Sequence, residues 1–337
     1  MLALLAATTE FAALKPWQDM ADSDVVGLTD PVTGETRLGC ILGNAGEVFG
    51  AAIYRGETGV RWLVNVLNGE ADCLHLDDAA SMDALKIELL PKREMRKEDL
   101  SRLKSLDFKP KGKGLVWPQF QSVQPGWLPW FIDQTETEQL VADVPRLSSF
   151  ATLFRQHPDL FDDHLPGEFP FLPHPIPSRP LELNDLNWRP IIPKPEVFEP
   201  FKATDEQLSQ LRALKHEAGA AYEYGSRVVS GSTVLEQGRR SYSRISLLVE
   251  QQRGLVLGFD MALASKPFGE AAGSGVVKAI LAGGLLPGTL WIDDNRLEPI
   301  LGQFCKLLNI KLRLSEELER LAEAEASLED FMRLGRR

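Results

Sequence analysis

Two adjacent aspartates, Asp293 and Asp294, are the residues of this chain whose type and position best suit chemistry. They follow an apolar run, Thr289–Ile292, that predicts a strand parallel to its neighbours. Ligands of open α/β sheets bind at the carboxyl ends of such strands, so both carboxylates are candidate catalytic residues. The competing interpretation is that they start the next helix, where Asp satisfies free backbone amides and interacts well with the helix dipole. The sequence favours this second interpretation.

A basic segment at residues 92–113 supplies candidate nucleic-acid contacts at Lys109, Lys111 and Lys113. Aromatic residues follow from Trp117 onward, and basic side chains beside aromatics can line a groove for a single strand. The simpler interpretation is a solvated helix face beside a packed loop. A net charge of −11 disfavours binding to nucleic acid over the whole surface.

A turn rich in proline and tryptophan is the candidate partner-binding surface, through Pro125, Trp127 and Trp130. Tryptophan is enriched among the residues that dominate binding energy at protein interfaces. The sequence therefore predicts a protein partner at this turn.

Other motifs of catalysis or cofactor binding do not occur in the sequence. Gly269, Gly273 and Gly275 match neither a phosphate-binding loop nor a dinucleotide fingerprint, and favour close helix packing. The polar groups at Cys73–His75 and at residues 157–164 lack the spacing of a metal site, and no nucleophile motif is found. We expect neither a metal nor a cofactor.

The composition is that of a folded globular protein, with 44% hydrophobic and 25% charged residues. Three cysteines, Cys40, Cys73 and Cys305, are odd in number and widely spaced, which favours a reducing compartment and a cytoplasmic location.

The apolar opening, Met1–Ala7, is short and has no basic residue before it, so we expect a helix there and no signal peptide. No run approaches the roughly 20 apolar residues that span a bilayer, so no membrane contact is expected.

The order of elements predicts an α+β protein of two domains. Residues 1–160 form the N-terminal domain, a β-meander of the strands Val25–Thr29, Thr36–Leu42 and Val48–Tyr54 covered by helices. Residues 161–203 form a proline-rich linker, because each proline removes a backbone donor.

Residues 204–337 form a C-terminal domain with a mixed α/β sheet. A helix is expected over Asp205–Ala221, followed by a hairpin of the strands Ser243–Val249 and Leu255–Met261. The helix Leu297–Leu308 has apolar residues at near-ideal spacing, and the strand Ile310–Leu314 follows it.

Motifs in both halves suggest a family. The N-terminal motifs are Lys15-Pro16-Trp17, Asp30-Pro31-Val32-Thr33-Gly34-Glu35, Tyr54-Arg55-Gly56 and Pro125-Gly126-Trp127-Leu128-Pro129-Trp130. The C-terminal motifs are Leu286-Pro287-Gly288-Thr289-Leu290-Trp291-Ile292-Asp293-Asp294 and Leu308-Asn309-Ile310-Lys311-Leu312. With these motifs the chain resembles a bacterial two-domain family of unknown function, which implies no activity.

The second half, with paired strands, a helix, a Pro-led strand ending in Asp293, a helix and a final strand, also resembles the ribonuclease-H-like core of integrases and transposases. That resemblance implies a metal-dependent nuclease or integrase-type enzyme using Mg²⁺ or Mn²⁺, with Asp293 or Asp294 as a metal ligand. The family also has an Asp on its first strand, where this chain offers Glu223 or Glu236, and a carboxylate on a late helix, where it offers Glu316, Glu317 or Glu319. A set with one member missing is degenerate, because two-metal chemistry needs convergent carboxylates.

Three functions follow in order of preference. A non-catalytic binding or interaction protein is favoured, because the motifs of catalysis are missing. A ribonuclease-H-like enzyme, degenerate in its carboxylates, is the alternative. Nucleic-acid binding through residues 92–113 is the third.

Overall fold

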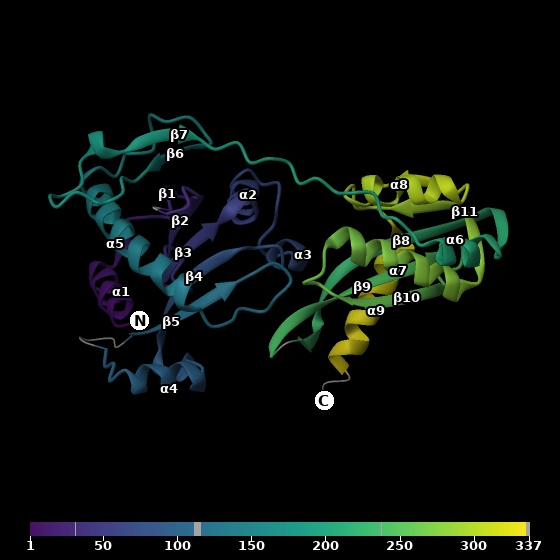
Figure 1. Ribbon diagram of the computed structural model, residues 1–337, viewed down its shortest axis with the longest axis horizontal. Helices are drawn as coiled ribbons and strands as arrows, with labels where there is room; N and C mark the ends of the chain where they lie inside the picture. The colour runs from purple at the N-terminus through teal and green to yellow at the C-terminus, as the bar shows by residue number, and fades with distance from the viewer. Residues whose placement is uncertain (31, 111–115, 237, 335–337) are drawn as a thin grey trace. The chain divides into compact units, whose positions relative to one another are not determined.

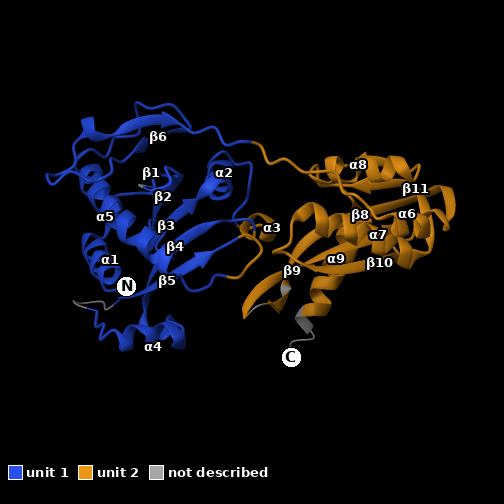
Figure 2. Ribbon diagram, viewed as in Figure 1, with its two compact units in different colours: residues 1–73, 81–124, 129–194 blue, residues 74–80, 125–128, 195–337 orange. Residues whose placement is uncertain are grey.

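A computed structural model of the chain describes residues 1–30, 32–110, 116–236 and 238–334 (Figure 1). It has an α+β fold and divides into two compact units (Figure 2). Unit 1 comprises Met1–Cys73, Ser81–Gln124 and Pro129–Lys194, and unit 2 comprises Leu74–Ala80, Pro125–Leu128 and Pro195–Arg337. Two short segments from the first half of the sequence therefore belong to unit 2. No helix in the described part of the chain combines the length and apolar composition needed to cross a bilayer.

Unit 1 is built on a mixed sheet whose described strands run in the order β5-β4-β3-β2-β1-β6-β7. These strands are β1 (Val26–Thr29), β2 (Thr36–Leu42), β3 (Gly50–Arg55), β4 (Ala84–Pro91), β5 (Val116–Val123), β6 (Glu168–Phe171) and β7 (Asn187–Pro190). The meander predicted from the sequence is confirmed, because β1, β2 and β3 pair antiparallel in succession. The pairing of β6 with β1 is parallel.

Helices cover both faces of this sheet. They are α1 (Leu2–Leu14), α2 (Gly56–Leu67), α4 (Lys97–Ser105) and α5 (Gln134–Gln156), with 3-10 turns at η1 (Pro16–Gln18), η2 (Lys92–Glu94) and η3 (Leu183–Asp185). Side chains of β3 alternate between the two cores: Ile53 packs with α1 and α5, and Tyr54 packs with α2. Figure 1 shows α5 and α2 on opposite sides of the strands.

A buried ion network joins α5 to the sheet of unit 1. The Arg37 guanidinium lies 2.9 Å from Asp30 and 2.9 Å from Asp143, and Asp143 also pairs with Arg146 at 3.1 Å. The arginines and Asp143 are almost completely buried, so each charge depends on its partner. Removal of one member would leave another charge buried without its counterion.

The proline-rich range 161–203, predicted as a linker, is divided between the units. Its first part contains β6 and β7, which pair with each other and join the sheet of unit 1. Its last part, 195–203, lies on unit 2, where Phe201 donates its backbone N–H to the Ile300 carbonyl at 2.9 Å. Prolines are tolerated here because β7 is the edge strand and β6 pairs with β1 at a single position, Gly27 opposite Phe171.

Unit 2 contains a second mixed sheet, with its described strands in the order β10-β9-β8-β11-β12. The strands are β8 (Lys215–Glu236), β9 (Arg239–Glu250), β10 (Val256–Leu263), β11 (Leu285–Ile292) and β12 (Lys311–Leu314). Strand β9 is antiparallel to β8 and β10, while β11 is parallel to β8 and to β12. The predicted hairpin is confirmed.

The helices of unit 2 lie on opposite faces of its sheet. They are α3 (Leu76–Ala79), α6 (Asp205–Arg212), α7 (Phe268–Gly283), α8 (Leu297–Leu307) and α9 (Glu319–Leu334). Helices α7 and α8 pack on the face that carries Tyr222 and Tyr224, and α9 packs on the face that carries Val229 and Leu247. The helix predicted over Asp205–Ala221 is wrong beyond α6, because residues from Lys215 pair with β11 as part of β8.

Candidate functional site

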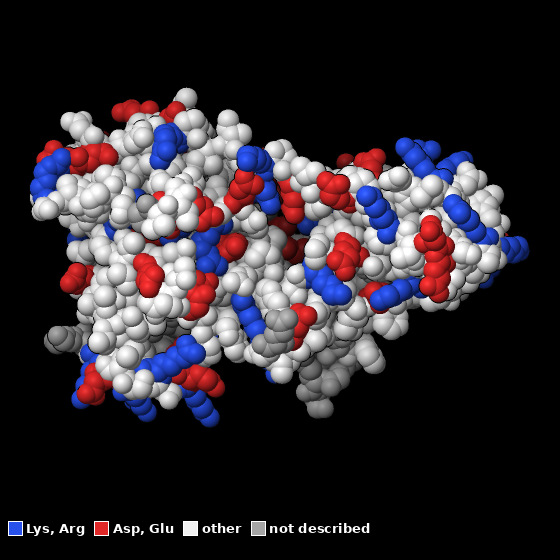
Figure 3. All heavy atoms as spheres, viewed as in Figure 1, with Lys and Arg blue, Asp and Glu red and all other residues white. Residues whose placement is uncertain are grey.

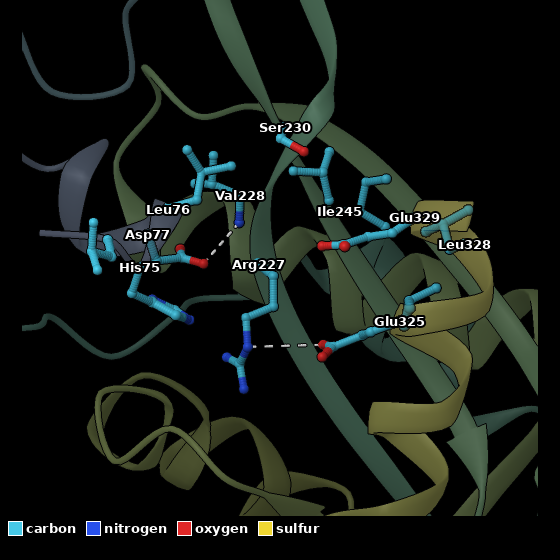
Figure 4. Close-up of a pocket in the computed structure, with 13 residues that line it drawn as sticks. His75, Leu76, Asp77, Arg227, Val228, Ser230, Ile245, Glu325, Leu328 and Glu329 are labelled. Atoms are coloured by element: carbon cyan, nitrogen blue, oxygen red, sulfur yellow. Dashed lines mark hydrogen bonds and ion pairs between the residues drawn. The ribbon is translucent and has the colours of Figure 1, made fainter. Parts of the chain in front are cut away.

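A pocket of about 460 Å³ opens in unit 2 on the face of the sheet that α9 partly covers (Figure 4). Its walls come from α3 and the residues just before it, from β8 and β9, and from the middle of α9. The lining residues are Leu74, His75, Leu76, Asp77, Arg227, Val228, Val229, Ser230, Ile245, Leu247, Glu325, Leu328 and Glu329. About half of these residues are apolar, and the others include charged groups from α3, β8 and α9.

Alternation along β8 places Arg227 on the α9 side of the sheet. Tyr222 and Tyr224 enter the core under α7, so the odd-numbered residues of this stretch face α9. Among these is Gly225, whose missing side chain gives α9 room: a Cβ there would lie 2.7 Å from Leu321 Cδ2. Close approach of α9 brings Glu325 beside Arg227, as Figure 4 shows.

Arg227 is surrounded by carboxylates from two other elements. Its Nη2 lies 2.5 Å from Asp293 Oδ1 and its Nη1 lies 3.8 Å from Asp294 Oδ2, both after the end of β11. Its Nε lies 3.8 Å from Glu325 Oε1 on α9. Burial lowers the pKa of Arg227, but Asp293 and Glu325 raise it more, so the pKa lies above its ordinary value. The guanidinium is a permanent positive charge at the centre of these acids.

Glu325 is the acid of the pocket whose protonation is most perturbed. Burial raises its pKa to about 7, Arg227 opposes the shift, and Asp293, Asp77 and Glu329 add to it. The carboxyl group is therefore close to half protonated at neutral pH. It can accept or release a proton when charge nearby changes.

Asp77 anchors α3 to the strands of unit 2. Its Oδ2 accepts a hydrogen bond from Val228 N at 3.0 Å, and its Oδ1 lies 3.0 Å from Arg244 Nη1. Arg244, on β9, also donates to the Ser226 carbonyl at 2.9 Å. Burial lowers the pKa of Arg244, and Asp77 opposes that shift. The segment Leu74–Ala80 is therefore an integral wall of the pocket.

The two aspartates singled out from the sequence have different partners. Asp293 faces Arg227, whereas Asp294 binds Arg296 through both oxygens, with Oδ2 at 2.7 Å from Nη2. Asp294 Oδ1 also accepts the Arg296 backbone N–H at 2.9 Å, which closes the turn before α8. The N-cap residue of α8 is Arg296, and its side chain makes no capping bond. The prediction that these aspartates cap the helix is therefore wrong, and Asp294 instead closes the turn that precedes α8.

The other acids proposed from the ribonuclease-H-like resemblance lie elsewhere. Glu223 is buried on β8 and accepts the Leu321 backbone N–H at 2.8 Å, which holds the start of α9. Glu236 lies at the far end of β8, 3.4 Å from the Ser265 hydroxyl. Glu316 and Glu317 precede α9, and Glu319 is its first residue. The position on β8 that faces Asp293 is occupied by Arg227.

Glu325 is the late-helix acid that sequence reasoning missed. It lies on the same helical face as Leu321, Leu328 and Met332, which pack on the sheet. The sequence pattern that could have identified Glu325 is a single carboxylate at a position of the helix otherwise occupied by apolar residues. In the described ranges, no group of three or more His, Cys, Asp and Glu side chains is arranged to hold a metal ion.

The predicted partner-binding turn is divided between the two units. Pro125 and Trp127 belong to unit 2, where the backbone of Trp127 bridges to Ser241 and Gly126 O accepts the Tyr242 N–H at 2.9 Å. Trp130 belongs to unit 1, where it bridges to Ser122 and remains 37% exposed. Their role in partner binding stays a prediction.

The basic segment is spread over η2 and α4, where basic and acidic side chains alternate on the surface (Figure 3). Lys109 is exposed, whereas Lys111 and Lys113 lie outside the described residues. Arg96 and Arg102 stack on Phe131, with guanidinium carbons 4.8 and 3.7 Å from the ring centre. These two arginines thus stack on an aromatic ring of unit 1 itself.

Comparison with known proteins identifies domains in both halves of the chain. Residues 2–171 match a domain of unknown function, DUF7309, and residues 207–329 match a second, DUF6930. No curated protein and no solved structure matches the chain. The pocket takes Asp77 from the first matched region and Arg227 and Glu325 from the second. The chain belongs to the family defined by the domain of unknown function DUF7309, here followed by the domain of unknown function DUF6930.

Proposed function

We propose that this protein is a non-catalytic binding protein whose pocket in unit 2 receives a small-molecule ligand. The observation that carries the proposal is the position of Arg227 between Asp293, Asp294 and Glu325. Two-metal phosphoryl transfer needs carboxylate oxygens that converge on metal ions. Here the protein's own guanidinium takes the central position and neutralises those oxygens.

The shape and lining of the pocket support ligand binding. Small-molecule sites are concave, have volumes of roughly 300–1,000 Å³, and combine apolar walls with a few polar groups. The pocket, at about 460 Å³, has apolar side chains that include Leu76, Ile245 and Leu328, and its polar groups include Arg227 and Glu325. A ligand can therefore bury apolar surface there and still find specific polar partners.

The second candidate is a ribonuclease-H-like enzyme that uses Mg²⁺ or Mn²⁺. The strand and helix order of unit 2 favours it, as does the presence of Asp293 at a strand end near Glu325 of the last helix. Under this alternative the carboxylates would have to exchange Arg227 for metal ions. Cleavage of nucleic acid by the wild type, lost in Asp293→Asn, would favour the enzyme over the binding protein.

A fragment screen on the full chain tests the binding proposal. Neutral, cationic and anionic fragments are screened by NMR, with Leu328→Trp as a variant that fills the pocket and Ala326→Trp as its control. Ala326 is exposed on the same helix, so its variant introduces the same tryptophan side chain outside the pocket. We expect fragments to bind the wild type and Ala326→Trp and to lose binding in Leu328→Trp. If no fragment of any charge binds at the pocket, the proposal fails.

A further inference from the structure

We infer that the pocket of unit 2 selects a small organic cation, an ammonium or guanidinium group carried on an apolar body. The inference rests on the proposed function, because it names the class of ligand that the same pocket holds. Three features support it: the balance of charge on the lining, the distance of the Glu325 carboxylate from its nearest cationic partner, and the apolar walls.

Acidic groups outnumber basic ones where the pocket is lined. Asp77, Glu325 and Glu329 contribute carboxylates, whereas Arg227 and His75 are the basic lining residues, and Asp77 is paired with Arg244, which does not line the pocket. Arg227 is already held by Asp293 at 2.5 Å, and Asp293 is not part of the lining. An anionic ligand would therefore meet the acids while competing with Asp293 for the guanidinium. A cation meets complementary charge.

The Glu325 carboxylate can accept a donor from the pocket. Its nearest cationic partner among the described residues is Arg227, whose Nε lies 3.8 Å from Oε1, beyond hydrogen-bond distance, and the Glu325 side chain is 30% exposed. Asp77 is closed to a ligand, because Val228 N and Arg244 Nη1 each lie 3.0 Å from one of its oxygens and Oδ1 is buried. An ammonium or guanidinium group in the pocket would donate hydrogen bonds to Glu325.

Glu325 couples binding to proton release. The charged groups that face it are Arg227 on β8, Asp293 after β11, Asp77 on α3 and Glu329 on α9. Burial raises its pKa to about 7, against the effect of Arg227 and with smaller contributions from the acids. An incoming cation favours the ionised carboxylate and lowers that pKa, so binding near pH 7 expels a proton from the protonated fraction.

The apolar walls select the body of the ligand. Val229, Ile245 and Leu247 come from the sheet, Leu328 from α9 and Leu76 from α3. A bare inorganic cation would leave these side chains uncovered. An arylalkyl or alkyl group would bury them, at about 25 cal/mol for each Å² of apolar surface removed from water.

Three matched probes test the inference on the full chain by isothermal titration calorimetry and NMR at pH 7. They are 2-phenylethylammonium, the neutral 2-phenylethanol and the anionic 3-phenylpropionate. We expect the ammonium to bind about tenfold more tightly than the alcohol, the scale of one charge-assisted hydrogen bond, and the carboxylate to bind most weakly. Ammonium binding should release protons, detected as an enthalpy that changes with the ionisation enthalpy of the buffer.

Variants of α9 provide matched controls. Glu325→Gln should weaken ammonium binding about tenfold, abolish proton release and leave the alcohol unaffected, whereas Glu323→Gln, two residues away and exposed, should change nothing. Equal or tighter binding of the alcohol or the carboxylate to the wild type would overturn the inference while the proposed function survives. If none of the probes and no screened fragment binds, the proposed function fails as well.

Discussion

Asp77 and Arg244 form a buried ion pair in unit 2, with 3.0 Å between Oδ1 and Nη1 and side chains 4% and 8% exposed. Asp77 lies within the region that matches the first domain and Arg244 within the region that matches the second. The pair therefore attaches the segment Leu74–Ala80, from the first half of the sequence, to the fold that the second half forms.

Asp77→Ala should destabilise unit 2 strongly. It leaves the buried Arg244 without its counterion and the Val228 N–H without its acceptor. Removing one partner of a buried ion pair costs about 3–5 kcal/mol. Urea unfolding followed by circular dichroism measures this change in the free energy of unfolding. The exposed Glu316→Ala should stay within about 0.5 kcal/mol of the wild type, and a similar value for Asp77→Ala would contradict the prediction.

A fragment that begins at Pro195 should not reproduce the stability of unit 2. It lacks Leu74–Ala80, which carries Asp77, and Pro125–Leu128, whose backbone pairs with β9. We expect broad NMR signals and a loss of cooperative unfolding. The control is the full chain cut at an engineered protease site near Lys194, which keeps every segment and should stay folded. A well-dispersed spectrum of the fragment alone would show that these segments are dispensable.

The stability of unit 2 should fall as the pH rises toward and through 7 because of Glu325. Its pKa is raised from 4.5 to about 7 in the folded state, so the folded state binds more protons than the unfolded state between these values. The stabilising effect of protonation is complete below about pH 4.5 and is lost as the pH passes about 7, a change of up to about 3 kcal/mol. Urea unfolding at pH 5.5 and 8 measures it. Glu325→Gln should remove this contribution and Glu323→Gln should retain it; identical pH profiles for the two variants would refute the assignment.

Gly225→Ala should displace α9 and weaken the pocket. The new Cβ would lie 2.7 Å from Leu321 Cδ2 and 3.1 Å from Glu325 Oε1, so the buried Leu321 side chain must move, which we expect to displace α9. Overpacking of this kind costs about 1–3 kcal/mol. The control is Gly219→Ala on the same strand, where a Cβ would meet nothing within 4 Å. Unfolding free energies and fragment affinities should fall for the first variant alone; equal effects would mean that Gly225 is not what sets the position of α9.

The elements that could be predicted from the sequence are those whose evidence is local. The meander of β1, β2 and β3 was readable from turn residues between alternating runs, and α8 from its apolar spacing. Residues 215–221 have helix-forming composition, yet they form the start of β8 because they pair with β11. Propensity is weak compared with a complete ladder of hydrogen bonds in a buried sheet.

The sequence by itself determined two folded halves, the strand that ends in Asp293, and the absence of catalytic motifs. Only the tertiary structure decided that Arg227 lies between Asp293 and Glu325, and that Asp77 forms a wall of the pocket in unit 2. The physical reason is that periodicity and capping depend on neighbouring residues, whereas a pocket depends on which distant strands and helices are brought together. Charges buried in such a place have no local signature, because their cost is offset by partners far away in the chain.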